Sequence, residues 1–208
     1  MTNCLNHKIM TEGIITSVTH TNRKGDKYYL HQGLTKRGSP KYFFSREKDG
    51  TLLRRIPEGY QIYENPNGLV FLRKAQPKIF SDEEMTIVEN AMENYADLEF
   101  YKIDVKRNAI IILLPLQDVE AIKEVISQCG LKTPAEINHT LQRIIRFSPE
   151  MQLILTDKEK RLFSLKRYCY RGVGSWIILE TSPDLKSLAK KYFKHLAKES
   201  VFDLLPGF

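Results

Sequence analysis

Turn-forming residues divide the first third of the chain into short segments. The connections IPEG and ENPNG pair a proline, which presets the backbone for a turn, with a glycine that tolerates a positive φ. Short strands at this spacing predict an antiparallel β meander or a small barrel. The predicted strands lie at residues 14–19, 28–32, 41–45, 60–63 and 69–73.

Helix-start signals follow this region. Ser81 with Glu84, and Thr133 with Glu136, each form a capping box, and Pro134 occupies a first helical position. Apolar spacing predicts helices at 82–95, from about 116 to before 130, at 134–143 and from 185 to at least 196. Further strands are predicted at 100–105, 109–114, 151–156, 161–170 and 176–180.

These elements predict an α+β fold in two parts. Residues 1–76 form a basic all-β module, a small antiparallel meander or barrel. Residues 77–208 form an α+β domain with antiparallel strands, about four helices, an acidic first half and a basic C-terminal helix. The order strand 69–73, helix, strand, strand, helix matches a split βαβ arrangement in order alone. The strand at 109–114 lacks the aromatic residues with which RNA-recognition versions stack bases.

Charge is distributed unevenly along the chain. The net charge is +7, yet residues 1–80 carry 14 basic and 6 acidic side chains, residues 81–130 carry 4 and 11, and residues 131–208 carry 14 and 8. Two basic ends therefore flank an acidic middle. Such asymmetry is typical of a polyanion-binding surface, and equally of segments that attract one another within or between chains.

Composition favours a globular protein in a reducing compartment. Hydrophobic residues make up 42% of the chain and charged residues 27%, enough to build a core. Cys4, Cys129 and Cys169 are widely spaced and odd in number, so they predict neither a disulfide framework nor a cysteine zinc site. We find no signal-like segment and no long apolar run, and we therefore expect a cytoplasmic protein without a membrane partner.

The stretch KYYLHQGLTKRGSPKYFFSR, residues 27–46, combines aromatic and basic side chains. Alternation along a strand directs Tyr42 and Phe44 to one face and Phe43 to the other. One set lines the core, while the other is a candidate for stacking nucleic-acid bases beside cations. The alternative is a hairpin whose rings fold the module and whose cations protect its edges. The predicted binding residues here are Tyr28, Lys36, Arg37, Lys41, Tyr42, Phe44 and Arg46.

Lysines recur every four residues on the predicted final helix. Lys186, Lys190, Lys194 and Lys198 form a positive ridge opposite the apolar stripe. Lys190 and Lys194 complete the predicted nucleic-acid site. The alternatives are a solvated helix face and contact with an anionic membrane surface. The membrane alternative is disfavoured, because the apolar stripe is needed against the strands.

Signals for catalysis or metal binding are weak. Cys169 shares a strand face with Arg167 and Arg171, which favours a thiolate, but no histidine is marked as its base. A buried structural thiol is the alternative. Glu136 and His139 have the spacing of one half of a di-metal carboxylate site, without the second half that such a site needs. We therefore predict neither a metal nor a cofactor.

Three function classes stay open. The leading prediction is a non-enzymatic binding protein for nucleic acid, DNA or RNA. The first alternative is an assembly module in which the acidic middle meets a basic end of another copy, giving a homo-oligomer, or of a partner protein. The second is an enzyme acting on nucleic acid or nucleotides with dispersed carboxylates. Candidates for these carboxylates are Asp104, Glu150, Asp157 and Glu180.

Overall fold

The computed structural model describes residues 17–130, 133–169 and 175–205. Within these residues, antiparallel sheets and four α-helices form an α+β fold, as the sequence predicts. The described chain divides into two compact units. The first holds the residues up to Tyr63 together with Val70–Lys74, and the second holds Glu64–Leu69 and the chain from Ala75 onward. Among the described residues, no helix combines the length and the apolar composition that a bilayer crossing requires.

Two antiparallel sheets make up the first unit. One has the order β1-β2-β3, and the other pairs β4 with β5. The second half of β2 has a further backbone neighbour, because the amide of Leu53 donates to Leu30 and the amide of Gln32 donates to Thr51, each at 2.9 Å. The strands are β1 (Thr19–Thr21), β2 (Lys27–Leu34), β3 (Pro40–Ser45), β4 (Tyr60–Glu64) and β5 (Val70–Lys74). Part of the strand predicted at 14–19 lies outside the described residues.

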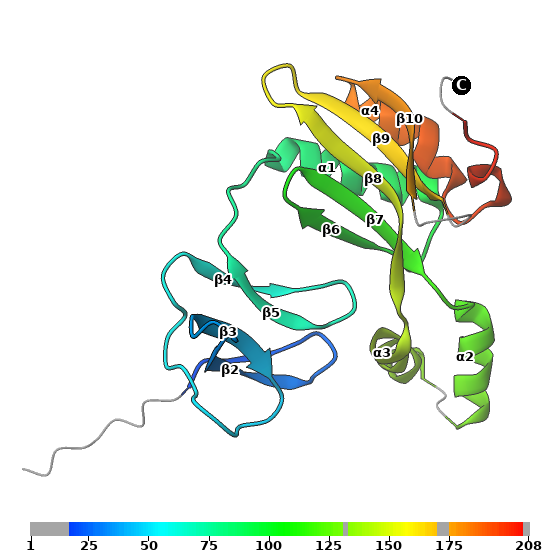
Figure 1. Cartoon of the computed structure of the whole chain (residues 1–208). Coiled ribbons are helices and arrows are strands. Elements are labelled where there is room, and N and C mark those ends of the chain that lie inside the picture. The colour runs from blue at the N-terminus through cyan, green and yellow to red at the C-terminus, as the bar shows by residue number, and fades with distance from the viewer. Residues whose placement is uncertain (1–16, 131–132, 170–174, 206–208) are drawn as a thin grey trace, which may run out of the picture. The chain divides into compact units, whose positions relative to one another are not determined.

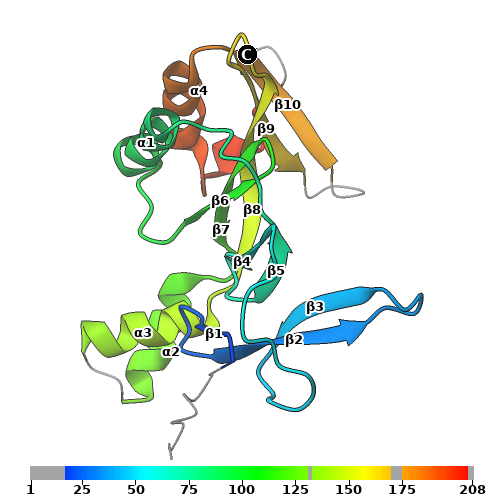
Figure 2. The ribbon, with the colours of Figure 1, turned by 90° about the vertical axis from the view of Figure 1, so that its left-hand side faces the viewer.

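β2 and β3 form a long ribbon whose closed end stands apart from the other strands of its unit (Figure 2). A turn from Thr35 to Ser39 closes it, with the Thr35 amide donating to the Ser39 carbonyl at 2.8 Å. Gly38 has a φ of 78°, which a glycine adopts without a steric penalty. Residues 34–41 are all exposed to solvent.

The second unit contains a five-stranded sheet with the order β10-β9-β8-β7-β6 (Figure 1). Each strand pairs antiparallel with the next one along the chain. The elements β5, α1, β6, β7 and α2 follow the predicted order, but β5 pairs with β4 and does not join this sheet, so no split βαβ arrangement forms. The strands are β6 (Lys102–Lys106), β7 (Ala109–Pro115), β8 (Phe147–Asp157), β9 (Leu162–Cys169) and β10 (Ser175–Ser182).

Helices α1 (Asp82–Ala91) and α4 (Leu185–Tyr192) lie together on one face of this sheet (Figures 1 and 2). Ser81 caps α1 as predicted: its hydroxyl oxygen accepts from the Glu84 amide at 3.1 Å, and the Glu84 carboxylate accepts from the Ser81 amide at 2.9 Å. Hydrophobic side chains form the core between the helices and the sheet. Its buried residues include Val88, Met92, Ile110, Ile112, Met151, Leu153, Leu188 and Phe193.

A smaller apolar cluster joins α2 (Val119–Gln128) and α3 (Pro134–Ile144) to the end of the sheet where β7 ends and β8 begins. Asp118 caps α2, so this helix begins three residues later than the apolar spacing predicts. Thr133 and Glu136 form the predicted capping box of α3. Leu141 and Ile145 are the most buried members of the cluster.

The last helix is shorter than predicted. α4 ends at Tyr192, and two 3-10 turns, η2 (Phe193–His195) and η3 (Glu199–Val201), follow it. The chain leaves the helix so that Phe193 and Leu196 are both fully buried, and Ala197 reverses it with a φ of 56°. The predicted four-lysine ridge is therefore divided between α4 and the irregular segment after it.

Candidate nucleic-acid interface

The register of β2 with β3 decides which side chains of the ribbon share a face. Tyr29 lies opposite Ser45, His31 opposite Phe43, and Gly33 opposite Lys41. Cross-strand partners project from the same side of a sheet, so tyrosine, histidine and phenylalanine meet on one face. Together with the lysines beside the Tyr29 and Phe43 rings they form what we call the basic-aromatic face: Lys27, Tyr29, His31, Lys41, Phe43 and Lys48.

Phe43 is held in place from below and remains open to solvent. Its ring stacks on the imidazole of His31 with centroids 5.2 Å apart and planes 11° from parallel. A side-chain carbon added at Gly33 would lie 3.4 Å from Phe43 Cε1, so the glycine leaves room for the ring. Phe43 nevertheless keeps 38% of its surface exposed, and Lys41 Nζ lies 5.7 Å from the ring centroid.

His31 acts as the rigid support of this ring. It is 3% exposed, and its Nε2 lies 3.0 Å from the Glu47 carbonyl oxygen, to which it donates as the Nε2–H tautomer. Its backbone also pairs with Leu52. The imidazole is therefore fixed from two sides, and the Phe43 stack lies on an ordered base.

Tyr29 is the second ring of the face. Lys27 Nζ lies 5.7 Å and Lys48 Nζ 5.4 Å from its centroid, both within the range of cation–π attraction. The tyrosine is half-buried, whereas both lysines are exposed. Long lysine side chains that rest on a ring in this way keep their ammonium groups in water, where they are available to an anion.

The opposite face of the ribbon carries the aromatic residues that were predicted from the sequence to bind nucleic acid. Tyr28 is 9% exposed beside the fully buried Leu30, so it belongs to the core of the unit. Tyr42 packs edge-on against Tyr60 of β4, with centroids 5.5 Å apart, and Tyr42 and Phe44 are both half-buried. These three residues stabilise the unit, and the more accessible rings lie on the other side.

The predicted cations of the first unit are all exposed. Lys36 and Arg37 occupy the turn at the end of the ribbon, Lys41 lies on the basic-aromatic face, and Arg46 follows β3. The structure therefore brings Lys41 together with Phe43, and it places Lys36 and Arg37 farther along the same ribbon.

Lys190 and Lys194 belong to the second unit. They line a hollow of about 520 Å³ with Lys191, Ser187, Asn94 and Tyr95. Lys191 Nζ lies 2.7 Å from a Glu180 carboxylate oxygen that also accepts from Tyr192 at 2.9 Å. The hydrogen bond from Lys191 lowers the pKa of Glu180 most, and that from Tyr192 lowers it further. The same hydrogen bond to Glu180 raises the pKa of Lys191. Lys191 is thus engaged, while Lys190 and Lys194 add positive charge to this hollow of the second unit.

The candidate catalytic carboxylates are engaged at different places. Asp104 lies 3.3 Å from Lys106 Nζ, and Asp157 accepts from the amides of Glu159 and Lys160 at 2.9 Å. Across the described ranges, no three acidic, histidine or cysteine side chains gather as a metal would require.

Cys169, the candidate nucleophile, ends β9 and is half-buried. The guanidinium of the neighbouring Arg167 donates to the Leu204 carbonyl at 3.0 Å, so it anchors the segment near residue 204. Arg171, the other predicted cation, lies outside the described residues.

Tyr29, Phe43, Lys27 and Lys48 were not among the predicted binding residues. Alternation separates the two aromatic sets, but it does not tell which set faces the core. Gly33 on β2 was an available indication, since a strand glycine diagonal to an aromatic residue on the next strand allows the ring to lie across it.

The chain matches no family model, no curated protein and no solved structure.

Proposed function

We propose that the first unit binds single-stranded nucleic acid through the basic-aromatic face. The observation that carries this proposal is Phe43, a ring that is 38% exposed although it is stacked on the buried His31 and flanked by Lys41. A fixed aromatic ring beside a cation is the arrangement on which single strands stack a base while a phosphate is neutralised.

Two rings of the face are close enough to receive neighbouring bases of one strand. Phe43 lies opposite His31, two positions along β2 from Tyr29, so the two aromatic residues are diagonal neighbours. Diagonal neighbours across an antiparallel pair are about 7–8 Å apart. Bases stacked on such rings contribute about 1–3 kcal/mol each, whichever base is present.

Charge supports the same ligand. Between Lys27 and Arg46 the sequence contains five basic residues and no acidic residue. Lys36 and Arg37 lie at the exposed turn of the ribbon and add two cations to Lys27, Lys41 and Lys48. A strand that follows the ribbon therefore passes cations along its phosphates, which favours association and makes it dependent on salt.

The direct test is fluorescence anisotropy with labelled single-stranded DNA, single-stranded RNA and duplex DNA at several salt concentrations. We expect binding to the single strands, with an affinity that falls as salt rises. A plot of log affinity against log salt concentration should have a slope of about −0.7 for each phosphate neutralised. Replacing Lys27, Lys41 and Lys48 together by alanine should reduce that slope by about 2.

A matched control replaces Lys158, Lys160 and Lys186, three exposed lysines of the second unit, and so removes the same charge without changing the ribbon. This variant should keep the wild-type slope. Equal loss in both triple variants would mean that net charge alone drives binding, and no anisotropy change with any nucleic acid at micromolar protein would end the proposal.

A further inference from the structure

The second unit contains a cavity that the nucleic-acid proposal does not use. Its volume is about 770 Å³, within the size range of sites for small organic ligands. It lies between the loop after the π-helix η1 (Met92–Ala96), the end of β7, the start of β8 and the segment around η3. Its apolar walls include Leu98, Phe100, Leu114, Pro115, Val201 and Phe202.

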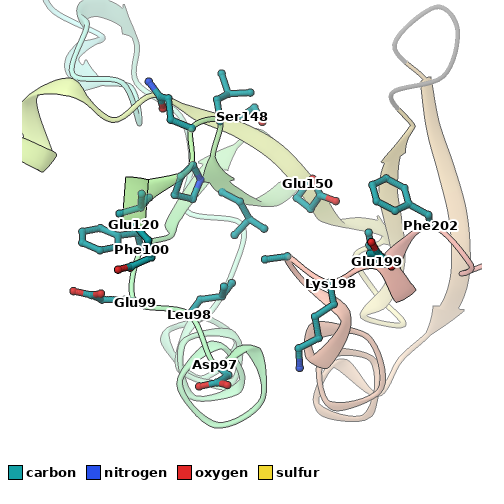
Figure 3. Close-up of a pocket in the computed structure, with 17 residues that line it drawn as sticks. Asp97, Leu98, Glu99, Phe100, Glu120, Ser148, Glu150, Lys198, Glu199 and Phe202 are labelled. Atoms are coloured by element: carbon teal, nitrogen blue, oxygen red, sulfur yellow. The ribbon is translucent and has the colours of Figure 1, made fainter. Parts of the chain in front are cut away.

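A β-bulge places Glu150 on the wall of this cavity. In the register of β7 with β8, Ile112 lies opposite Met151 and Leu113 opposite Pro149, so the pairing skips Glu150. Bulges of this kind turn a side chain away from the regular alternation and are common beside binding sites. Glu150 is 8% exposed, and Figure 3 shows it between Phe100 on one side of the cavity and Phe202 on the other.

The polar lining is predominantly acidic. Besides Glu150, the residues that line the cavity include Asp97, Glu99, Glu120 and Glu199, and one basic residue, Lys198. Lys123 binds Glu99 at 2.7 Å and Glu120 at 2.8 Å, which offsets one of these charges. The lining therefore keeps a negative balance, and it selects against anions such as nucleic acid.

Two residues of the lining have left-handed backbones although neither is glycine. Asp97 has a φ of 51° where η1 ends, and Ala197 has a φ of 56° between η2 and η3. Such conformations are unfavourable for residues that carry a side chain, and they recur where a site imposes the path of the chain. Both loops that border the cavity are thus held in costly but defined shapes.

We propose that this cavity binds a small organic cation with an apolar body. The ammonium or amidinium group lies near Glu150 and Glu199, and the apolar body packs between Phe100 and Phe202. Neutral ligands of the same shape gain only the apolar contact, and anionic ones meet the carboxylates. The charge of the lining thus decides among ligands that the cavity volume alone would admit.

The test uses three probes of one shape and different charge: 4-phenylbutylammonium, 4-phenylbutanol and 4-phenylbutyrate. Each is titrated into the full chain while amide chemical shifts are followed by NMR. We expect the ammonium to bind about tenfold more tightly than the alcohol, since a charge-assisted contact adds about 1.4 kcal/mol, and the carboxylate to bind most weakly. The shifts should centre on residues 97–100 and 197–202.

Variants separate charge from apolar contact. Glu150→Gln and Glu199→Gln should each bring the affinity for the ammonium several-fold closer to that for the alcohol, while Glu159→Gln, an exposed control in the β8–β9 turn, should change neither. Phe202→Ala, at a residue 58% exposed and so tolerant of truncation, should weaken both probes alike.

The proposal is overturned if the alcohol binds as tightly as the ammonium, or if no probe shifts those two segments at millimolar concentration. It is independent of the nucleic-acid proposal. Cavity variants should leave the anisotropy titrations unchanged, and basic-aromatic variants should leave the probe titrations unchanged, so either proposal can fail alone.

Discussion

The ribbon β2–β3 and the pair β7–β8 are both antiparallel pairs, but their surroundings differ. In both pairs, successive side chains along a strand project to opposite faces. In β7–β8 the residues Ile110, Ile112, Met151 and Leu153 are fully buried beneath α1 and α4. In β2–β3 one face supports the unit through Tyr28 and Leu30, and the other leaves Phe43 exposed. The difference is that the ribbon leaves one aromatic face partly open to solvent, and this is the face on which the nucleic-acid proposal rests.

Truncating one residue on each pair of strands tests this difference in burial. Leu153→Ala removes a fully buried side chain from the apolar core, and we expect the free energy of unfolding to fall by about 2–5 kcal/mol. Phe43→Ala should lower it by only about 1–2 kcal/mol, because 38% of this residue is already exposed to water. Urea titration of each variant gives both values.

Similar losses in the two variants would contradict the account, since Phe43 would then be a core residue. A folded Phe43→Ala protein is also what makes the binding tests interpretable.

The second prediction concerns the binding of nucleic acid by the ribbon. Phe43→Ala should weaken binding of single-stranded nucleic acid by about 1–3 kcal/mol, the contribution of one stacked base. Phe71→Ala is the matched control, because Phe71 is 45% exposed on β5 and stacks on Tyr63. Anisotropy titrations at one salt concentration compare the two. Equal effects would show that any exposed phenylalanine of the unit serves as well.

The third prediction concerns the helices that cover the second sheet. Ser81→Ala removes the side-chain acceptor of the Glu84 amide at the start of α1, and we expect it to destabilise the second unit by about 1 kcal/mol. Thr86→Ala, an exposed change within the same helix, is the control and should cost less. Thermal unfolding monitored in the second unit tests this, and an unchanged midpoint for Ser81→Ala would contradict it.

The smallest expected effect is on the pH dependence of the second unit. Burial works to raise the pKa of Glu84, but the hydrogen bond from Arg161, the Ser81 amide and the Arg161 charge together hold it below its ordinary value of 4.5. A carboxyl with a lowered folded-state pKa stabilises the fold above its unfolded-state pKa, and this stabilisation is lost as pH falls through the folded-state value. Glu84→Gln should therefore lose less stability than wild type below about pH 4.5. Urea titrations of both proteins at several pH values test this. If Arg161 contributed nothing, wild type would lose no more stability on acidification than Glu84→Gln.

Features determined by neighbouring residues in the chain were predicted well. The capping boxes at Ser81 and Thr133 are present because a cap needs only the residues of one helical turn. The turns that separate the strands were likewise recognised from glycine and proline. The end of α4 was not, because the chain leaves the helix to bury Phe193 and Leu196 against distant residues.

The candidate sites depended on tertiary structure in the same way. Alternation divides the ribbon into a Tyr42 set and a Phe43 set, but contact with Tyr60 of β4 decides which one is covered. The bulge at Glu150 had one signal that was available, since a proline within a strand, here Pro149, is typical of bulges and edges. The cavity beside it needs loops from four separate segments, which no local pattern predicts.

Photocrosslinking tests the central claim most directly, because it reports which rings the bases touch. A single-stranded oligonucleotide carrying 5-iodouracil is irradiated with the full chain, and the crosslinked peptides are identified by mass spectrometry. The account predicts crosslinks at Phe43 and Tyr29. Crosslinks confined to the second unit, or to Tyr42 and Phe44 on the opposite face of the ribbon, would contradict it.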